Sequence, residues 1–163
     1  MWGINAGSMG NITESEWKSA NLTNEKAITE FMIGKFRLLQ QCDEKFETFF
    51  MFLFDFCKAN KETQRIVDIE TCISVLDAIF SSECDEDEVT FSNLAKQRYP
   101  HIVRIIRYLS ENILSIKCLN KDQWSNLLSF SKAISLNFEN YDINSAWPIL
   151  LDNYVIWCKN KEQ

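Results

Sequence analysis

Apolar residues recur at steps of three and four positions along most of this chain, which is the period of an amphipathic helix. The pattern predicts four helices in the second half, with inward stripes of Ile69, Cys72, Ile73, Leu76 and Phe80; Ile102, Ile105, Ile106, Leu109 and Ile113; Trp124, Leu127, Phe130, Ile134 and Phe138; and Trp147, Leu150, Leu151, Tyr154 and Cys158. No stretch alternates with a period of two for long enough to predict a sheet. The sequence therefore predicts an all-α fold.

Polar and charged residues mark where several helices begin and end. Thr13-x-x-Glu16 is a capping box that opens a short helix. A second helix ends near Gln41, and Asp43 favours the beginning of a third, because acids there meet the positive end of the helix dipole. Asn120 suits an N-cap and Pro100 a first helical turn.

The third helix is apolar on almost every side. One face carries Phe46, Phe49, Phe50, Leu53 and Cys57, and a second face carries Phe52 and Phe56. A helix of this kind is buried on several sides, so we predict a central position for it.

Composition narrows the choice of fold and partner. The 163 residues fit one domain, and 4 Gly and 2 Pro are too few for the turns of a sandwich or barrel. The net charge of −6 predicts basic partners and gives no basic footprint for nucleic acid. There is no apolar run of membrane-spanning length and no secretory signal, so we expect no membrane and a location in the cytoplasm and nucleus.

Catalytic and metal-binding patterns are weak. His101 is the single histidine and has no cysteine at a zinc-site spacing, so we expect a surface histidine. The acidic run 81–88 is predicted to be a solvated loop, and a calcium loop starting at Asp85 fails because Lys96 stands where the closing Glu belongs. We predict no catalytic residues, no cofactor and no metal.

Two motifs in the last third carry a family resemblance. They read Lys121-Asp122-Gln123-Trp124-x-x-Leu127-Leu128-x-Phe130 and Asn140-Tyr141-Asp142-x-x-x-Ala146-Trp147-Pro148-x-Leu150-Leu151-Asp152. Together they resemble the potentiating-neddylation (PONY) domain of the defective-in-cullin-neddylation family. Upstream, Trp2, the aromatic run 45–56 and Val67-Asp68-Ile69-Glu70 resemble further segments of that domain.

The resemblance implies a helical bundle of two packed EF-hand-like halves over residues 1–163. Residues 1–60 correspond to the rest of the first half with the central helix, and residues 61–163 to the C-terminal half that binds cullin. On this interpretation the first half is truncated at its start.

The same resemblance implies a non-catalytic scaffold co-ligase. Such a domain binds the C-terminal winged-helix region of a cullin and the conjugating enzyme of the neddylation pathway, and so promotes transfer of the modifier to a cullin lysine. It forms no covalent intermediate itself.

Two sites follow from the resemblance. The cullin-binding residues are Asp122, Ala146 and Asp152, with Asp122 in the first turn of its helix and Asp152 about two turns into the last helix. A plainer interpretation is that Asp122 only complements its helix dipole and Asp152 is only solvated. The pocket for the acetylated N-terminus of the conjugating enzyme would be lined by Ile4, Met9, Ile12, Phe56, Val75 and Ala78, although each could equally be an ordinary core residue.

Two other functions stay open from the sequence. One is an EF-hand-derived helical adaptor that binds another basic protein or helix. The other is a cysteine-dependent transferase, for which six scattered cysteines give little support.

Overall fold

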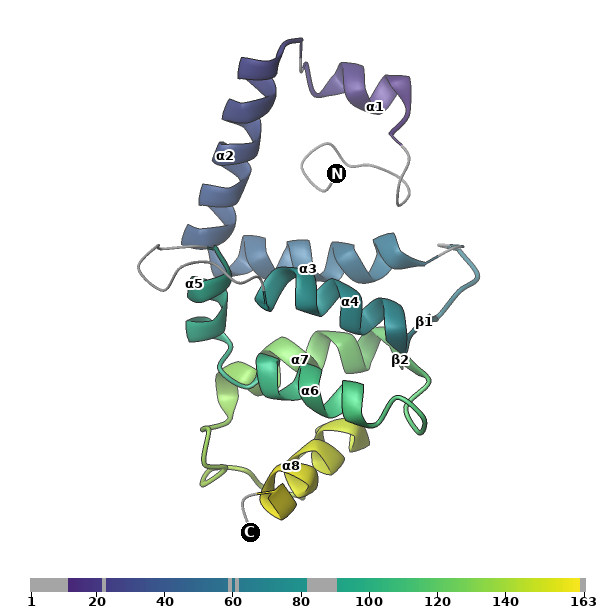
Figure 1. Ribbon diagram of the computed structural model, residues 1–163, viewed down its shortest axis with the longest axis vertical. Coiled ribbons are helices and arrows are strands. Elements are labelled where there is room, and N and C mark those ends of the chain that lie inside the picture. Colours follow the sequence, from purple (N-terminus) through teal and green to yellow (C-terminus); the bar gives the residue numbers. More distant parts are fainter. Residues whose placement is uncertain (1–11, 22, 59, 61, 82–90, 162–163) are drawn as a thin grey trace. The chain divides into compact units, whose positions relative to one another are not determined.

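The computed structural model describes residues 12–21, 23–58, 60, 62–81 and 91–161 (Figure 1). The chain divides into two compact units, Met1–Gln64 and Arg65–Gln163, and each is described by itself. Most of the acidic run 81–88, and Ile4 and Met9, fall outside the described residues.

The first unit contains α1 (Glu14–Ser19), α2 (Glu25–Gln41) and α3 (Asp43–Cys57). The capping box is confirmed: the Glu16 backbone N–H donates to Oγ1 of Thr13, and the Thr13 N–H donates to the Glu16 carboxylate. The predicted end at Gln41 and start at Asp43 are also confirmed.

Aromatic side chains fill the described core of the first unit. Phe46, Phe50, Phe54 and Phe56 of α3 are buried. The rings of Phe52 and Phe56 stack with centroids 5.2 Å apart, and Phe31 of α2 packs against Phe56. These contacts explain why α3 is apolar on several sides.

The second unit contains β1 (Ile66–Asp68), α4 (Ile69–Phe80), α5 (Phe91–Arg98), α6 (Ile102–Glu111), β2 (Cys118–Asn120), α7 (Lys121–Ala133) and α8 (Ile149–Lys161). Helix α4 contacts α5, α6 and both strands, and α8 packs on α6 and α7 (Figure 1). The fold is all-α apart from the one short strand pair, as predicted, and none of the described helices is both long and apolar enough to cross a membrane.

The prediction that no sheet forms is wrong in detail. Strands β1 and β2 pair antiparallel, with Val67 opposite Leu119, and both of these side chains are buried. Three residues are too few to give an alternating pattern in the sequence. The pair brings together the residues before two helices, because Asp68 caps α4 and Asn120 caps α7.

Two helix boundaries also differ from the predictions, and one helix was not predicted. Helix α7 ends at Ala133, so Ile134 and Phe138 lie beyond it, although both are buried. Their periodic spacing reflects burial rather than helix, and Phe138 has φ 59°, which a helix excludes. Helix α6 begins at Ile102, after Pro100 rather than with it. Helix α5 was not predicted, because it has only eight residues and few apolar ones.

The last helix begins later than its apolar stripe indicated. Helix α8 starts at Ile149, so Trp147 precedes it. Asp152 therefore lies in the first turn of α8 and not two turns along it. This position moves its carboxylate to the positive end of the helix dipole.

Candidate functional site

Asp122 lies in the first turn of α7, exposed to solvent. The helix start is fixed by a second capping box: the Gln123 N–H donates to Oδ1 of Asn120 at 2.8 Å, and the Asn120 N–H donates to Oε1 of Gln123 at 3.0 Å. Asn126, one turn later, donates its side-chain amide to Oδ1 of Asp122 at 3.2 Å. The Asp122 carboxylate is thus held on the surface.

Ala146 lies exposed in the loop between α7 and α8. The next residue, Trp147, is half-buried, and its ring meets the ring of Phe130 edge-on at a centroid distance of 5.2 Å. This contact fixes the backbone beside Ala146. Because Ala146 carries only a methyl group, a partner can approach the backbone closely at this point.

Asp152 is half-buried in the first turn of α8 and has one anchored oxygen. The hydroxyl of Tyr141 donates to its Oδ1 at 2.5 Å. Burial, then the hydrogen bond and charge of Asp152, and then the charge of Asp142 raise the pKa of Tyr141 to about 12. Tyr141 is therefore a neutral donor at every physiological pH, and the Asp152 carboxylate keeps one orientation.

His101 is fully buried, so the predicted surface histidine is wrong. Its Nε2 lies 3.1 Å from the carbonyl oxygen of Ile134 and 3.2 Å from that of Ser135. A carbonyl oxygen only accepts, so the proton lies on Nε2 and Nδ1 accepts from the Tyr154 hydroxyl at 2.9 Å. Burial is the main cause that lowers the pKa of His101, and nearby Arg104 adds to it.

The same contacts hold the beginning of the loop that carries Tyr141 and Ala146. His101 binds the two carbonyls that follow α7, and its ring packs against Phe138 with centroids 5.1 Å apart. Asn140 closes the turn, accepting from the Ser135 N–H and donating to the Ala133 carbonyl, both at 2.8 Å. No spacing in the sequence indicates the His101 contacts, because they join the residue before α6, the segment after α7 and Tyr154 of α8.

The chain, with Asp122, Ala146 and Asp152 placed as above, can now be compared with known proteins. The sequence profile of the family described as "Cullin binding" matches residues 30–157. The chain belongs to the cullin-binding family. Its relatives include DCN1-like protein 5 of Homo sapiens, 30% identical over 164 residues, which are 99% of this chain and 61% of the relative.

DCN1-like protein 4 gives a similar result. The Homo sapiens protein is 30% identical over 99% of this chain and 50% of its own length, and the Drosophila melanogaster protein is 27% identical over 96% of this chain and 56% of its own length. The chain thus spans between half and two thirds of the relatives it matches. The resemblance to the defective-in-cullin-neddylation family is confirmed.

The three cullin-binding residues predicted for this family member lie in the second unit. Asp122 and Asp152 each occupy the first turn of a helix, and Ala146 lies in the loop that joins those helices. Helices α7 and α8 pack against each other. The Asp122 carboxylate is exposed, and the Asp152 carboxylate is half-buried beside the Tyr141 hydroxyl.

The six residues predicted for the conjugating-enzyme pocket are distributed differently. Ile4 and Met9 are outside the described residues. In the first unit Ile12 is 41% exposed, whereas Phe56 is buried against Ala20, Phe31 and Phe52. In the second unit Val75 is half-buried and Ala78 exposed on α4. These two groups belong to separately described units, and the pocket stays a prediction.

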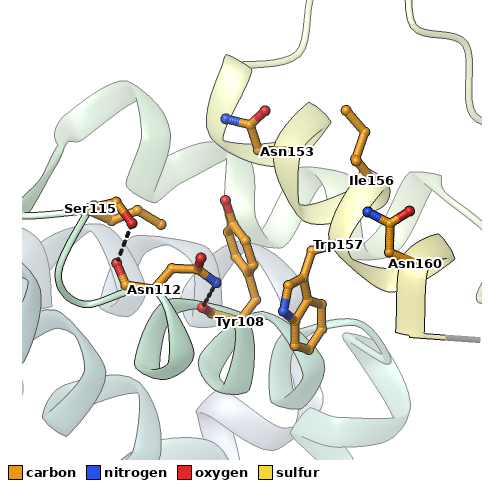
Figure 2. A pocket seen from close by; sticks show the side chains of 8 residues that line it. Tyr108, Asn112, Ser115, Asn153, Ile156, Trp157 and Asn160 are labelled. Carbon is orange, nitrogen blue, oxygen red and sulfur yellow. Dashed lines mark hydrogen bonds between the residues drawn. The ribbon is translucent and has the colours of Figure 1, made fainter.

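Two clefts flank the exposed side of α8, with Ile156 on the rim of both. One has a volume of about 400 Å³ and a mixed lining, in which Asn112, Asn153 and Asn160 lie beside Tyr108 and Trp157 (Figure 2). The other, of about 520 Å³, is more apolar and is lined by Tyr141, Asp142, Ile143, Val155, Ile156 and Lys159. The second cleft shares Tyr141 with the Asp152 site.

Sequence reasoning missed several residues around the site. Tyr141 was only part of a turn motif, yet it orients Asp152. Ile149 and Ile156 remain exposed while α8 buries its opposite side, and their spacing of seven positions was a signal that could have found them.

Proposed function

We propose that this chain acts as a non-catalytic scaffold in cullin neddylation. It would bind the C-terminal winged-helix region of a cullin and the neddylation conjugating enzyme together, and so promote modifier transfer. One observation carries the proposal: a member of the cullin-binding family has an exposed Asp122, an exposed Ala146 and an Asp152 oriented by Tyr141.

Electrostatics support a basic partner for this surface. The chain has a net charge of −6, and the two aspartates are at helix starts in the second unit. Complementary charge of this kind sets the orientation and association rate of a complex more than its affinity. The small side chain of Ala146 would let the basic surface come close to both carboxylates.

The state of the histidine and the described cysteines supports a scaffold over a transferase. Both ring nitrogens of His101 are engaged in the core, so it has no free nitrogen to serve as a base. Cys72 and Cys158 are buried, and Cys42, Cys57 and Cys118 are partly buried. A nucleophilic cysteine needs an accessible thiol, which Cys72 and Cys158 do not offer.

The conjugating enzyme would be bound through its acetylated N-terminus. Acetylation removes the charge of the terminal amine, and burying an unpaired ammonium is expensive. In the first unit the apolar neighbourhood of Phe56, with Phe31 and Phe52, is chemistry that suits such a neutral terminus.

The deciding experiment is a neddylation assay with a purified cullin C-terminal fragment, the conjugating enzyme and its activating components. We expect the parent chain to accelerate modification of the cullin lysine and to bind the fragment in calorimetry. The Ala146→Arg variant should do neither. A parent chain that binds no cullin fragment, yet captures another basic protein, would favour the helical adaptor instead.

A further inference from the structure

Helix α8 carries two exposed isoleucines, among polar residues, on the side away from its buried residues. Its inward side buries Leu150, Leu151, Tyr154, Val155 and Cys158. Its outward side carries Ile149, 75% exposed, and Ile156, 50% exposed.

The acidic residue of the site lies between these two isoleucines. Ile149 and Ile156 are seven positions apart, or two helical turns, so they share one face of α8. Asp152 is three positions after Ile149 and four before Ile156, which puts it on the same face. A single exposed isoleucine is ordinary, but two that bracket a carboxylate form a patch.

A cleft extends the patch away from the helix. Ile143, 66% exposed in the loop before α8, lines the 520 Å³ cleft together with Ile156 and Val155. Tyr141 forms another part of its lining and also donates its hydroxyl to Asp152. The cleft and the carboxylate are therefore joined through one ordered side chain.

We propose that this cleft receives an apolar side chain of the same cullin surface whose basic residue meets Asp152. This inference rests on the proposed function and names a second contact for that partner. The occupant is a basic residue accompanied by an apolar one, because the Asp152 carboxylate lies beside a cleft whose lining is mainly apolar and also includes the opposite charges of Asp142 and Lys159. Water leaving Ile143 and Ile156 supplies affinity, and the Asp152 charge supplies orientation.

The test compares serine variants by calorimetry with a purified cullin C-terminal fragment. Ile156→Ser and Ile143→Ser should each weaken binding about fivefold, which corresponds to losing part of the burial of one aliphatic side chain. Leu114→Ser is the matched control: Leu114 is 85% exposed, lies outside this cleft, and its variant should bind like the parent. Unchanged far-ultraviolet circular dichroism establishes that each variant is folded.

Measuring binding at several salt concentrations and temperatures distinguishes the apolar contact of Ile143 and Ile156 from the charged contact of Asp152. The isoleucine variants should keep the salt dependence of the parent but bind with a less negative heat-capacity change. Asp152→Asn should weaken binding about tenfold and reduce the salt dependence. If Asp152→Asn weakens binding while both isoleucine variants match Leu114→Ser, the apolar contact is refuted and the proposed function stands. If the parent binds no cullin fragment, both fail.

Discussion

The Tyr141 hydroxyl and the Asp152 carboxylate lie 2.5 Å apart and join the loop before α8 to the first turn of that helix. Partial burial and the negative charge of Asp152 raise the pKa of Tyr141 to about 12. Asp152→Asn keeps the shape of the side chain but removes its charge. We therefore predict that this substitution lowers the pKa of Tyr141 toward its ordinary value of 10.0.

Nuclear magnetic resonance of tyrosine labelled at the ring Cζ measures this pKa directly. Tyr141→Phe assigns the signal, since the chain has 4 tyrosines. Asp142→Asn is the matched control, because the charge of Asp142 contributes least to the raised pKa of Tyr141, so removing it should lower that pKa less. An unchanged pKa in Asp152→Asn would mean that the hydrogen bond does not form in solution.

If Asp122, Ala146 and Asp152 form the proposed cullin-binding surface, substitutions at these positions should weaken binding. Ala146→Arg adds bulk and positive charge where a basic partner docks, so we expect it to abolish binding of a cullin C-terminal fragment. Asp152→Ala and Asp122→Ala should each weaken binding about tenfold, as truncation of a paired interfacial aspartate does. Ser110→Arg adds the same side chain at an exposed position of α6 and should leave binding unchanged. Parent-like affinity in all three site variants would disprove the surface.

Because His101 is buried and its pKa is lowered, we predict that the folded protein loses stability in mild acid. Its folded-state pKa lies below 6.5, so the unfolded chain takes up a proton before the folded chain does. The contribution of neutral His101 to folding stability is therefore fully present above pH 6.5. It declines as the pH falls from 6.5 through the lowered folded-state pKa of His101. Protonation would place hydrogen on Nδ1, which now accepts from Tyr154.

Urea unfolding at about pH 7.5 and about pH 5.5 tests the slope in a range where carboxylates remain ionised. The urea midpoint of the parent should be lower at the acidic pH. The His101→Phe variant should be less stable than the parent at both pH values, and its midpoint should not show this pH dependence. Because the chain has 1 histidine, its imidazole resonance reports the pKa without ambiguity. A measured pKa above 6.5 would contradict the prediction.

The capping box of α7 predicts a local effect on the site. Asn120→Ala removes the acceptor for the Gln123 N–H and should lower the free energy of unfolding by about 1 kcal/mol. Asn120→Asp keeps an acceptor and should change stability much less. Hydrogen exchange should be faster at the start of α7 in the alanine variant, and slow exchange there would show that the β1–β2 pairing alone fixes this end.

We predict that acetylation of the conjugating-enzyme N-terminal peptide changes its affinity for the chain. The acetylated N-terminal peptide should bind measurably better than the same peptide with a free amine, because the apolar site cannot compensate a buried ammonium. Calorimetry on the matched pair checks this. Equal affinities at a saturable site would remove the acetyl-binding pocket from the proposed function.

The sequence alone indicated most of the helices. Local interactions explain this success: Thr13 with Glu16 and Asn120 with Gln123 are contacts across three positions, and helical periodicity repeats within each element. The cullin-binding residues remain a prediction from the family resemblance. The motifs around Asp122 and Ala146 were readable for the same reason, because each lies within a short continuous segment.

Tertiary structure alone decided how the site is supported. The buried state of His101 depends on Ile134, Ser135 and Tyr154, which are 33 or more positions away in the sequence. The anchoring of Asp152 by Tyr141 depends on a loop whose residue Phe138 has a left-handed backbone. Periodicity records that a residue is buried but not what buries it, so Phe138 was predicted to lie on a helix although it lies in the loop after α7.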